Sequence, residues 1–489
     1  MTTQGIMNLF KEILTIPRES GHEEHIIKYL QDFAKTHKLE CKTDQAGNVL
    51  IIREASKGKE NVPTIVLQSH SDMVCEKNAG VVHDFAKDPI HAVEENGWLI
   101  AKDTTLGADC GIGMAAQMAV LIDNTIQTGR IEALFTTSEE TGMDGAMALQ
   151  PGFITGNLLI NLDSEDEGEL FIGCAGGIDT TAKFKYTTYP ATKEFIKCEF
   201  KIFGAQGGHS GDDIDKNRAN ANKILARFLY RVLDKHTIEL YEIDGGNKRN
   251  AIAREAYAVI GFSKRDRKSV MNIFNTVVNE VKTEFLVSDN AIDGIAREVG
   301  IHDIKEGKVI GEPQKAIDQN VTAALIYSLN CAPHGVLAMS PDIKNLVETS
   351  TNLASVKMTG GNIIRIGTSQ RSSLNSCRRY AAEQVEACFA LAGAQVTHES
   401  EYPGWKPNLN SAILEISRQA YKKLFGTEPI VRAIHAGLEC GLFLDIYPNL
   451  DMISFGPTLR GVHAPGEKLE LSTVEKFRKL LEEIIVTIK

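Results

Sequence analysis

Carboxylate and imidazole side chains recur along this chain where apolar runs end or tight loops begin. The residues whose types could act together are His70, Asp72, Asp109, Glu139, Glu140, Asp163 and His463. Two histidines and several carboxylates, with no thiolate required, are the ligand types of a hydrolase that uses two metal ions. Such a site would activate water for attack on a carbonyl group, so the set indicates a reaction as well as a fold.

His70 and Asp72 are two residues apart at the end of the apolar run Thr64–Gln68. In an extended strand, residues at this spacing project to the same side. One interpretation is that His70 binds a metal while Asp72 accepts its other ring N–H, which would fix the tautomer. The alternative is a buried histidine that is hydrogen-bonded to Asp72 only for stability.

Asp109 lies in the glycine-rich stretch Thr105–Gly113, where backbone can approach closely and adopt unusual dihedral angles. A carboxylate at this point could bridge two cations through its two oxygens. It could equally be an acid at a helix N-terminus, where free N–H groups favour negative charge. The stretch also resembles a phosphate-binding loop, but no Lys-Ser/Thr follows it, so a nucleotide-binding protein is disfavoured.

Glu139 and Glu140 follow the apolar run that ends at Thr137, and Asp163 ends the next one. Adjacent carboxylates repel each other unless one of them is neutralised. A metal on Glu140 would leave Glu139 free as general base for water. The alternatives are a solvated acidic turn for the Glu-Glu pair, and a turn-capping role for Asp163.

Four more residues stand in glycine-rich or polar loops, and each has a structural alternative. His463 could be a ligand or a structural histidine, and His209, in Gly-Gly-His-Ser-Gly, could contact a ligand or belong to a plain turn. Arg371 could clamp a carboxylate with two hydrogen bonds, or be a solvated surface residue. His435, in His-Ala-Gly-Leu-Glu-Cys-Gly, indicates a tight turn after a strand, and we place it with the substrate-binding candidates.

Length and composition exclude several classes of protein. The chain has 489 residues, 43% of them apolar, which suggests two or three domains instead of one core. Its net charge is −11, and no basic patch with interleaved aromatic residues is present, which argues against nucleic-acid binding. Clustered carboxylates in one cleft would instead attract cations.

Location is indicated by the N-terminus, the hydropathy and the cysteines. The start lacks a basic region followed by an apolar stretch, and no run approaches 18 apolar residues, so we expect neither a signal peptide nor a membrane span. The nine cysteines are dispersed and form no Cys-x-x-Cys pair. This usage predicts reduced thiols, no disulfides and no cysteine-based zinc finger, in a cytoplasmic protein.

The patterning predicts an α/β catalytic domain that is interrupted by an insertion. Residues 5–185 alternate helical and strand patterns, and three nearly continuous apolar runs fit buried parallel strands. These runs are Thr64–Gln68, Ile131–Thr137 and Leu158–Asp163, with a crossover helix predicted over Gly111–Asp123. From about residue 401 the α/β pattern returns, and a final helix is predicted with Ser472 as N-cap and Glu475 in a capping box.

Between these parts the pattern changes to half-exposed strands and amphipathic helices. The order of strands and helices over 187–400 recurs once, which suggests an α+β insertion built of two similar halves back to back. We therefore expect a first catalytic part at 1–186, an inserted lid or dimerisation domain at 187–400, and a second catalytic part at 401–489.

Taken in order, the motifs resemble those of the M20 metallopeptidase family, and within it the aminoacyl-histidine dipeptidases, over essentially the whole chain. The stretches that carry the resemblance are Leu67–Lys77, Thr105–Gly113, Thr137–Met143, Asn161–Glu165, Gly207–Gly211, Asn250–Ile252, His435–Gly441 and Gly461–Glu467. The resemblance implies a zinc-peptidase catalytic domain with a mostly parallel central sheet. It also implies an inserted lid, which is longer here than the single α+β unit of typical members.

The resemblance further implies a pair of Zn²⁺ ions per chain, for which Co²⁺ or Mn²⁺ could substitute. Asp109 would bridge them, with His70 and Asp163 completing one site and Glu140 and His463 the other. Asp72 would orient His70, Glu139 would be general base and then acid, and His209 would stabilise the oxyanion. Asn250 and Arg371 match positions that contact the substrate backbone and carboxylate. Whether His209 would serve its own chain's site or a partner's stays open.

We therefore expect a metal-dependent dipeptidase that takes small dipeptides with free termini and favours Xaa-His substrates such as β-alanyl-histidine. The expected assembly is a homodimer, with no nucleic-acid or membrane partner. A tripeptidase or an N-acyl amino acid hydrolase on the same scaffold is the nearest alternative, because only the pocket would differ. A binding protein without catalysis is disfavoured because every core position is filled.

Overall fold

The computed structural model describes residues 1–299, 303–305, 308–310 and 314–489. The chain divides into two compact units. The first unit comprises Met1–Cys174, Trp405–Ala433 and Leu438–Lys489, and the second comprises Ala175–Gly404 and Ile434–Gly437. The second unit is thus inserted into the first, and its boundary precedes β9 (Gly176–Lys185), twelve residues before the expected start at 187.

The first unit is built on a sheet of eight strands in the order β1-β2-β6-β3-β7-β23-β8-β22. Their bounds are Glu40–Thr43, Val49–Arg53, Ile131–Thr136, Ile65–His70, Leu158–Asn161, Asp451–Ser454, Glu169–Cys174 and Ile430–Ile434. The central pairs β3–β6, β3–β7 and β7–β23 are parallel. Because β3 and β6 are buried along their whole length, their residues are almost continuously apolar, as buried parallel strands require.

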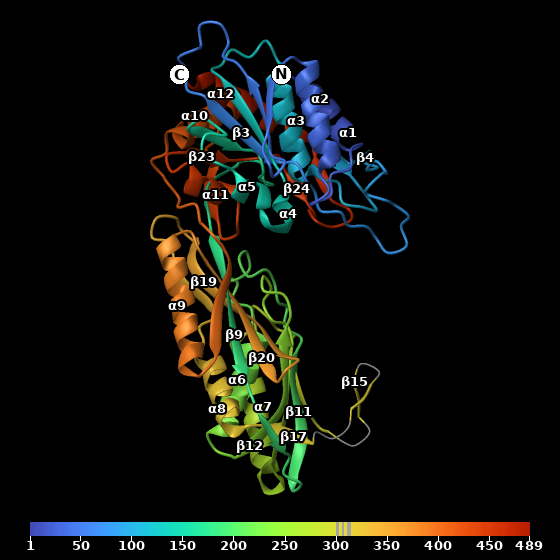
Figure 1. Cartoon of the computed structure of the whole chain (residues 1–489), viewed down its shortest axis with the longest axis vertical. Coiled ribbons are helices and arrows are strands. Elements are labelled where there is room, and N and C mark those ends of the chain that lie inside the picture. Colours follow the sequence, from blue (N-terminus) through green and yellow to red (C-terminus); the bar gives the residue numbers. More distant parts are fainter. Residues whose placement is uncertain (300–302, 306–307, 311–313) are drawn as a thin grey trace. The chain divides into compact units, whose positions relative to one another are not determined.

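Helices pack around this sheet (Figure 1). They are α1 (Thr3–Ile13), α2 (Glu24–Thr36), α3 (Ala108–Ile122), α4 (Glu139–Gly142), α5 (Asp144–Ala148), α10 (Ala412–Phe425), α11 (Glu439–Ile446) and α12 (Leu471–Thr487). A small sheet in the order β24-β25-β5-β4 adds Leu459–Arg460, Lys468–Glu470, Trp98–Ile100 and Val93–Glu95. The apolar crossover helix α3 contacts β3 and β6, as the predicted βαβ unit requires.

Strand register places the chemistry-bearing residues at one edge of this sheet. His70 is level with Thr136 across β3–β6, and Gln68 is level with Asn161 across β3–β7. The three parallel strands therefore end together, and the residues that follow them emerge at the same edge. Ligand sites of open α/β sheets lie at this carboxyl edge.

The second unit is built on one antiparallel sheet in the order β14-β11-β13-β12-β19-β20-β9-β21, with β18 paired to β19. The strands other than β9 are Asp293–Glu298, Phe195–Phe203, Ala256–Ser263, Ile238–Gly246, Val347–Thr359, Ile363–Ser372, Gln395–Tyr402 and Gly335–Met339. The helices are α6 (Ala221–Leu233), α7 (Arg267–Glu284), α8 (Gln319–Cys331) and α9 (Asn375–Leu391), with a short 3₁₀ turn at Lys264–Asp266. Two-stranded ribbons pair β10 (Thr188–Pro190) with β17 (Lys315–Ile317) and β15 (Asp303–Lys305) with β16 (Lys308–Ile310).

The two predicted halves of the insertion are joined edge to edge. Strand β12 of the first half pairs with β19 of the second, so that one sheet runs through both. A single apolar cluster also spans them, from Phe200 and Phe274 to Phe389. The two halves, which follow each other along the chain, therefore share one sheet, which continues through backbone hydrogen bonds that element order alone does not reveal.

Two further sequence expectations concern the final helix and the cysteines. The helix α12 begins at Leu471 with Glu470 as N-cap, so the predicted Ser472 cap is wrong. Ser472 instead donates its hydroxyl hydrogen bond to the Glu470 carboxylate at 3.0 Å. All nine cysteines are free thiols. Within the described ranges, no helix combines the length and apolarity needed to cross a bilayer.

Candidate metal centre

The first unit brings His70 to two of the predicted acids. Its Nε2 lies 3.0 Å from Oδ1 of Asp109 and 3.3 Å from Oδ1 of Asp163. The strand end of β3 supplies the histidine, the start of α3 supplies Asp109, and the segment after β7 supplies Asp163. Three potential ligand atoms from three elements therefore converge on one point.

A second convergence lies on the other side of the same aspartate. Nε2 of His463 lies 3.0 Å from Oδ2 of Asp109 and 3.0 Å from Oε2 of Glu140. Each oxygen of Asp109 thus faces one histidine and, beyond it, one further carboxylate. This is the geometry expected of a carboxylate that bridges two cations.

The residues at these two convergences fit a pair of divalent cations. Three carboxylates and two imidazoles supply the N and O donors that Zn²⁺ and Mn²⁺ accept. The Oε1 atom of Glu140 is buried and has no hydrogen-bond partner among the described residues. Gathering Asp109, Asp163 and Glu140 in a buried place is costly without positive charge, and bound cations would remove that cost. A metal-capable grouping of His70, Asp109 and Glu140 agrees with this, and so does one of His70, Cys110 and Asp163.

The pKa values of these residues are shifted by burial and by the neighbouring carboxylates. Burial and the charge of Asp109 raise the pKa of Asp163 to about 7, against the opposing charge of His70. Hydrogen bonds to Asp109 and Glu140 raise the pKa of His463 to about 11. Burial raises the pKa of Glu139 well above its ordinary value, and Asp163, Glu439 and Glu140 add to that shift.

Asp72 holds both the first histidine and the turn that carries Glu139. Its Oδ1 lies 3.4 Å from Nδ1 of His70, and its two oxygens accept the backbone N–H groups of Glu139 and Glu140 at 3.1 and 3.2 Å. Burial opposes the charged form, but the hydrogen bond and charge of His70 bring the pKa of Asp72 down to about 2. The turn is further fixed because Glu23 accepts both the N–H and the hydroxyl of Ser138 at 2.9 Å. Ser138 has φ +53°, which a side chain adopts only under such constraint.

A further buried acid, outside the predicted set, lies close to this centre. Glu439 is 1% exposed, and its Oε2 accepts hydrogen bonds from Gln68 Nε2 at 2.6 Å and Thr136 Oγ1 at 2.8 Å. Its Oε1 has no partner among the described residues. Burial raises the pKa of Glu439 to about 8, against the opposing charge of His70. The Gln68 amide continues the network to Asn161 at 2.6 Å, beneath the ends of β3 and β7.

The second unit brings together the loops of His209 and Asn250. His209 and Ala251 form an isolated β-bridge, and Ser210 N–H donates to the Asn250 carbonyl at 2.9 Å. The Nδ1 atom of His209 accepts the N–H groups of Gly211 and Asp212 at 3.3 and 3.2 Å, which fixes the ring. Gly208 has φ +142°, and a Cβ there would lie 2.1 Å from a guanidinium nitrogen of Arg218, so the tight loop requires glycine.

Arg371 and His435 lie in the same unit and near the His209 loop. Arg371 on β20 is level with Ser350 on β19, and Ser350 Oγ lies 2.7 Å from Nε2 of His435. A Cβ on Gly211 would lie 2.3 Å from the His435 carbonyl oxygen, so this loop and His435 are in contact. Burial and the charge of Arg371 lower the pKa of His435 to about 3. The guanidinium donates to the Tyr402 hydroxyl at 3.2 Å, while its buried Nε has no partner among the described residues.

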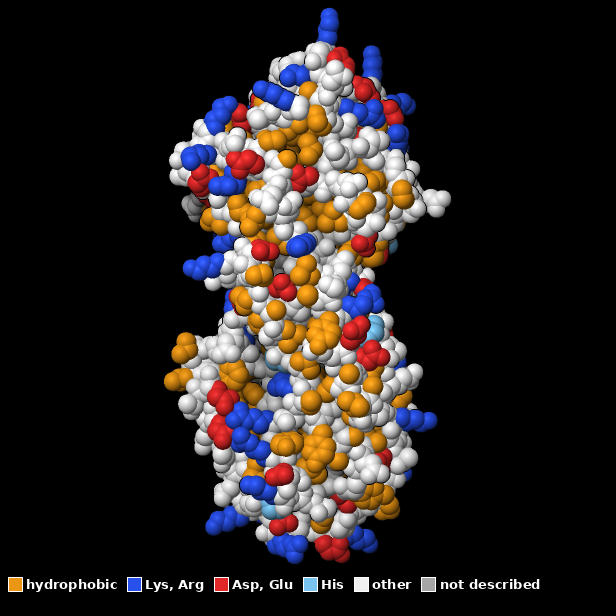
Figure 2. Space-filling model, turned by 90° about the vertical axis from the view of Figure 1, so that its left-hand side faces the viewer, with side chains coloured by type: hydrophobic (Ala, Val, Ile, Leu, Met, Phe, Trp, Pro, Cys, Tyr) orange, Lys and Arg blue, Asp and Glu red, His pale blue; other side chains and the backbone are white. Residues whose placement is uncertain are grey.

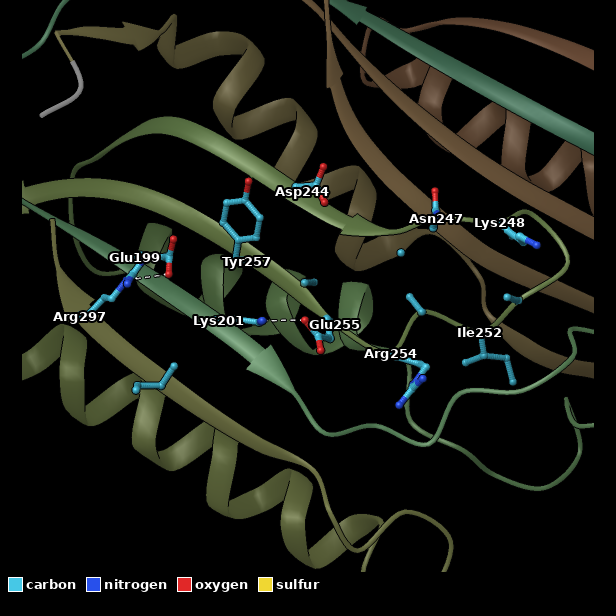
Figure 3. A pocket seen from close by; sticks show the side chains of 15 residues that line it. Glu199, Lys201, Asp244, Asn247, Lys248, Ile252, Arg254, Glu255, Tyr257 and Arg297 are labelled. Atoms are coloured by element: carbon cyan, nitrogen blue, oxygen red, sulfur yellow. Dashed lines mark ion pairs between the residues drawn. The ribbon is translucent and has the colours of Figure 1, made fainter. Parts of the chain in front are cut away.

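A pocket of about 790 Å³ lies on the sheet of the second unit (Figure 3). It is lined by residues of β11 to β14 and of the 247–255 loop between β12 and β13, and two pairs of its charged side chains form ion pairs. Lys201 lies 2.6 Å from Glu255, and Arg297 lies 2.9 Å from Glu199. None of the predicted site residues lines it. On the face of the molecule drawn in Figure 2, cationic and anionic side chains are interspersed, and that face has no extended basic surface.

Five buried residues that surround the candidate metal centre were not predicted from the sequence, namely Arg18, Glu23, Gln68, Glu439 and Glu467. Glu439 and Glu467 lie inside two of the motif stretches. The sequence shows their carboxylates but not the groups that these carboxylates bind. Arg18 and Glu23 stand in no motif, because their contacts are with segments fifty or more residues away. No local signal in the sequence could have revealed them.

Comparison with known proteins shows the family of this chain. Residues 66–487 match Peptidase family M20/M25/M40. The chain is 38% identical over 489 residues to the cytosol non-specific dipeptidase of Escherichia coli (strain K12), covering 99% of this chain and 98% of that protein.

Solved structures show the same likeness. The crystal structure of aminoacylhistidine dipeptidase from Vibrio alginolyticus superposes with a TM-score of 0.90 at 38% identity, covering 99% of this chain and 96% of that one. The aminopeptidase PepT of Bacillus cereus shares the fold, with a TM-score of 0.57 at 17% identity and coverage of 100% and 99%. The chain therefore belongs to the M20 peptidase family, Peptidase family M20/M25/M40, whose members are metal-dependent hydrolases of peptide bonds.

Proposed function

We propose that this protein is a dipeptidase that holds two divalent cations, Zn²⁺ in the first instance, at the Asp109 centre. The observation that carries the proposal is that the two oxygens of Asp109 face two separate histidine–carboxylate groups. His70, Asp109 and Asp163 would hold one cation, and Asp109, Glu140 and His463 the other. The names of the Escherichia coli and Vibrio alginolyticus relatives support dipeptides as the substrate class.

When bound, the cations supply Lewis acidity and lower the pKa of a water molecule. Glu139 is the group that receives the water's proton. Its backbone N–H donates to Asp72, which fixes the turn that carries the Glu139 carboxylate. Glu139 then gives this proton to the leaving nitrogen. General acid–base catalysis of this kind contributes about 10²- to 10⁴-fold.

The second unit supplies polar groups of the kind that recognise a dipeptide. We propose that His209 donates to the oxyanion, that Asn250 and His435 contact the substrate backbone, and that Arg371 pairs with its C-terminal carboxylate. A buried guanidinium with a free N–H group is suited to such a carboxylate. Pairing of both termini would limit the enzyme to short peptides, and Xaa-His dipeptides such as β-alanyl-histidine would be preferred. We also expect a cytoplasmic homodimer, which light scattering on the purified protein tests.

The decisive experiment measures metal content and hydrolysis together. The purified chain is assayed with β-alanyl-histidine, Ala-His, Gly-Gly-Gly and an N-acetyl amino acid, before chelation, after chelation and after return of Zn²⁺. We expect two metal ions per chain, hydrolysis of the two dipeptides, and loss and recovery of activity with the metal. Hydrolysis of Gly-Gly-Gly or of the acylated substrate alone would indicate a tripeptidase or an acylase. Full activity without divalent metal would refute the proposal.

A further inference from the structure

Glu467 caps the loop that carries Asp109. Its Oε2 accepts the N–H groups of Leu106 and Gly107 at 2.7 and 3.0 Å, and its Oε1 accepts those of Ala108 and Asp109 at 2.8 and 3.5 Å. The residue is 2% exposed. One buried carboxylate therefore satisfies four successive backbone donors that lead into α3, and it fixes the direction in which the Asp109 side chain leaves the loop.

The same residue belongs to the loop of the second histidine. His463 and Glu467 are four residues apart, and Glu467 N–H donates to the Ala464 carbonyl at 3.1 Å. The backbone of this loop is also joined to the segment before Asp109, because Gly466 N–H donates to the Ala101 carbonyl at 2.9 Å. Glu467 thus ties the Asp109 loop to the segment that presents His463.

Arg18 ties the other side of the Asp109 loop to the first histidine. The guanidinium donates from Nη1 to the carbonyls of Ser71 and Asp72 at 3.2 and 2.6 Å, and from Nη2 to the carbonyl of Gly107. Arg18 is 1% exposed. The carbonyls of Ser71 and Asp72 directly follow His70, so this arginine joins the chain next to one histidine to the loop of the shared aspartate.

Gly107 shows how closely the guanidinium approaches this loop. Gly107 has φ +67°, and a Cβ at this position would lie 2.4 Å from Nη2 of Arg18 and 2.8 Å from Sδ of Met73. Only glycine permits both the backbone conformation and the contact. The Asp109 loop is therefore held by an anion on its N–H side and by a cation on its carbonyl side.

We propose that Arg18 and Glu467 are positioning residues that hold the Asp109 carboxylate midway between His70 and His463, and so allow two cations to bind together. Neither residue is a ligand in our assignment. The inference rests on the proposed metal centre, but it concerns how Asp109 is positioned between the two histidines of that centre. Partners that orient ligands in this way typically change metal affinity by about 10- to 100-fold when they are altered.

The test uses two variants, Glu467→Gln and Arg18→Lys, and two matched controls. In Glu467→Gln, the amide NH₂ group replaces one carboxylate oxygen and cannot accept the two backbone N–H groups that this oxygen accepted. In Arg18→Lys, the ammonium group lacks the planar guanidinium that donates to two loops at once. Glu132→Gln is the first control, because Glu132 is a buried carboxylate that accepts the Thr155 and Gly156 N–H groups at the opposite end of β6. Arg53→Lys is the second, because Arg53 is buried and donates to the carbonyls of Val120 and Ile126.

Each full-length protein, freed of metal by chelation, is titrated with Mn²⁺ and followed by calorimetry and by electron paramagnetic resonance. We expect Glu467→Gln and Arg18→Lys to bind the second Mn²⁺ about 10- to 100-fold more weakly, and to lose the spin-coupled signal of a bridged pair. The controls should bind as the wild type does. If one variant does not fold, the other carries the test.

The outcomes separate this inference from the proposed function. If both variants bind Mn²⁺ as the wild type does, or if the controls weaken equally, the positioning role is refuted while the dipeptidase proposal stands. If the wild type binds no pair of Mn²⁺ ions and hydrolyses no dipeptide, the proposed function fails, and the inference with it.

Discussion

The carboxylate of Asp72 accepts the backbone N–H of Glu139 at 3.1 Å. The same carboxylate lies 3.4 Å from Nδ1 of His70. One buried acid therefore fixes the orientation of a proposed metal ligand and of the proposed general base at the same time. From the sequence, only the contact of Asp72 with His70 could be predicted. The contact with Glu139 joins the ends of two strands that are 67 positions apart, so the sequence does not show it.

Because it serves both groups, altering Asp72 should impair metal binding and turnover together. We expect Asp72→Asn to lower metal affinity and kcat, each by about 10- to 100-fold, because an amide cannot accept hydrogen bonds at both oxygen positions. Ser20→Ala is the matched control, since it removes only the hydroxyl that donates to Asp72 Oδ2 at 2.7 Å. Metal affinity is measured by titration and kcat by steady-state kinetics. Equal values for Asp72→Asn and Ser20→Ala would contradict the dual role.

The adjacent glutamates should separate catalysis from metal binding. Glu139→Gln should lower kcat by about 10²- to 10⁴-fold and leave metal content unchanged, because it removes the proton acceptor only. Glu140→Gln should instead deplete one metal ion, because Glu140 lies 3.0 Å from His463 at the second convergence. Elemental analysis of both proteins after gel filtration decides the matter, and loss of metal from Glu139→Gln would make Glu139 a ligand.

Asp109 should be the residue on which both cations depend. Asp109→Ala should empty or disorder both sites, since each carboxylate oxygen faces its own histidine at 3.0 Å. Asp163→Ala is the comparison, because of the two histidines Asp163 pairs with His70, so its loss should affect one metal ion. Unchanged metal content in Asp109→Ala would exclude the bridge.

The sheet edge that positions the site could be predicted from the sequence, because buried parallel strands leave a strong apolar signature. The runs before His70, Glu139 and Asp163 correspond to β3, β6 and β7, which end in register. The joining of the two halves of the insertion could not be predicted, because the pairing of β12 with β19 depends on backbone hydrogen bonds between residues more than a hundred positions apart.

The supporting residues of the site escaped prediction for a related reason. Arg18 contacts carbonyl groups, and any residue supplies a carbonyl, so its partners have no compositional signature. Glu467 likewise binds backbone N–H groups of a loop that is 358 or more positions away in sequence. Long-range hydrogen bonds between a side chain and the backbone can therefore be identified only from the folded structure.

The depressed pKa of His435 should appear in the pH dependence of stability. Burial and the charge of Arg371 lower this pKa from its ordinary value of 6.5 to about 3. Between these pH values the unfolded chain binds a proton that the folded chain does not, so the free energy of unfolding should fall by about 1.4 kcal/mol per pH unit on acidification. Above pH 6.5 neither the folded nor the unfolded chain binds this proton, so His435 no longer changes the free energy of unfolding with pH.

Urea unfolding at pH 5, 6 and 7 tests this dependence in the wild type and in His435→Asn. The variant should lack the fall in the free energy of unfolding that His435 causes on acidification. His398→Asn is the control, because His398 lies in the same unit but is partly exposed beside Glu386. An acid slope that is identical in the wild type and in His435→Asn would show that His435 is not the titrating group.

Arg371 should determine recognition of the substrate's C-terminus. It is 8% exposed, and its Nε has no partner among the described residues, so a carboxylate would gain a charged hydrogen bond. Arg371→Ala should raise KM for Ala-His by about 10- to 100-fold, since such bonds contribute about 1.5–3 kcal/mol, and it should spare Ala-His amide. Arg365→Ala, an exposed arginine on the same strand β20, should change neither substrate. Equal damage to the free and the capped dipeptide would mean that Arg371 supports the fold of β20 and does not bind the carboxylate.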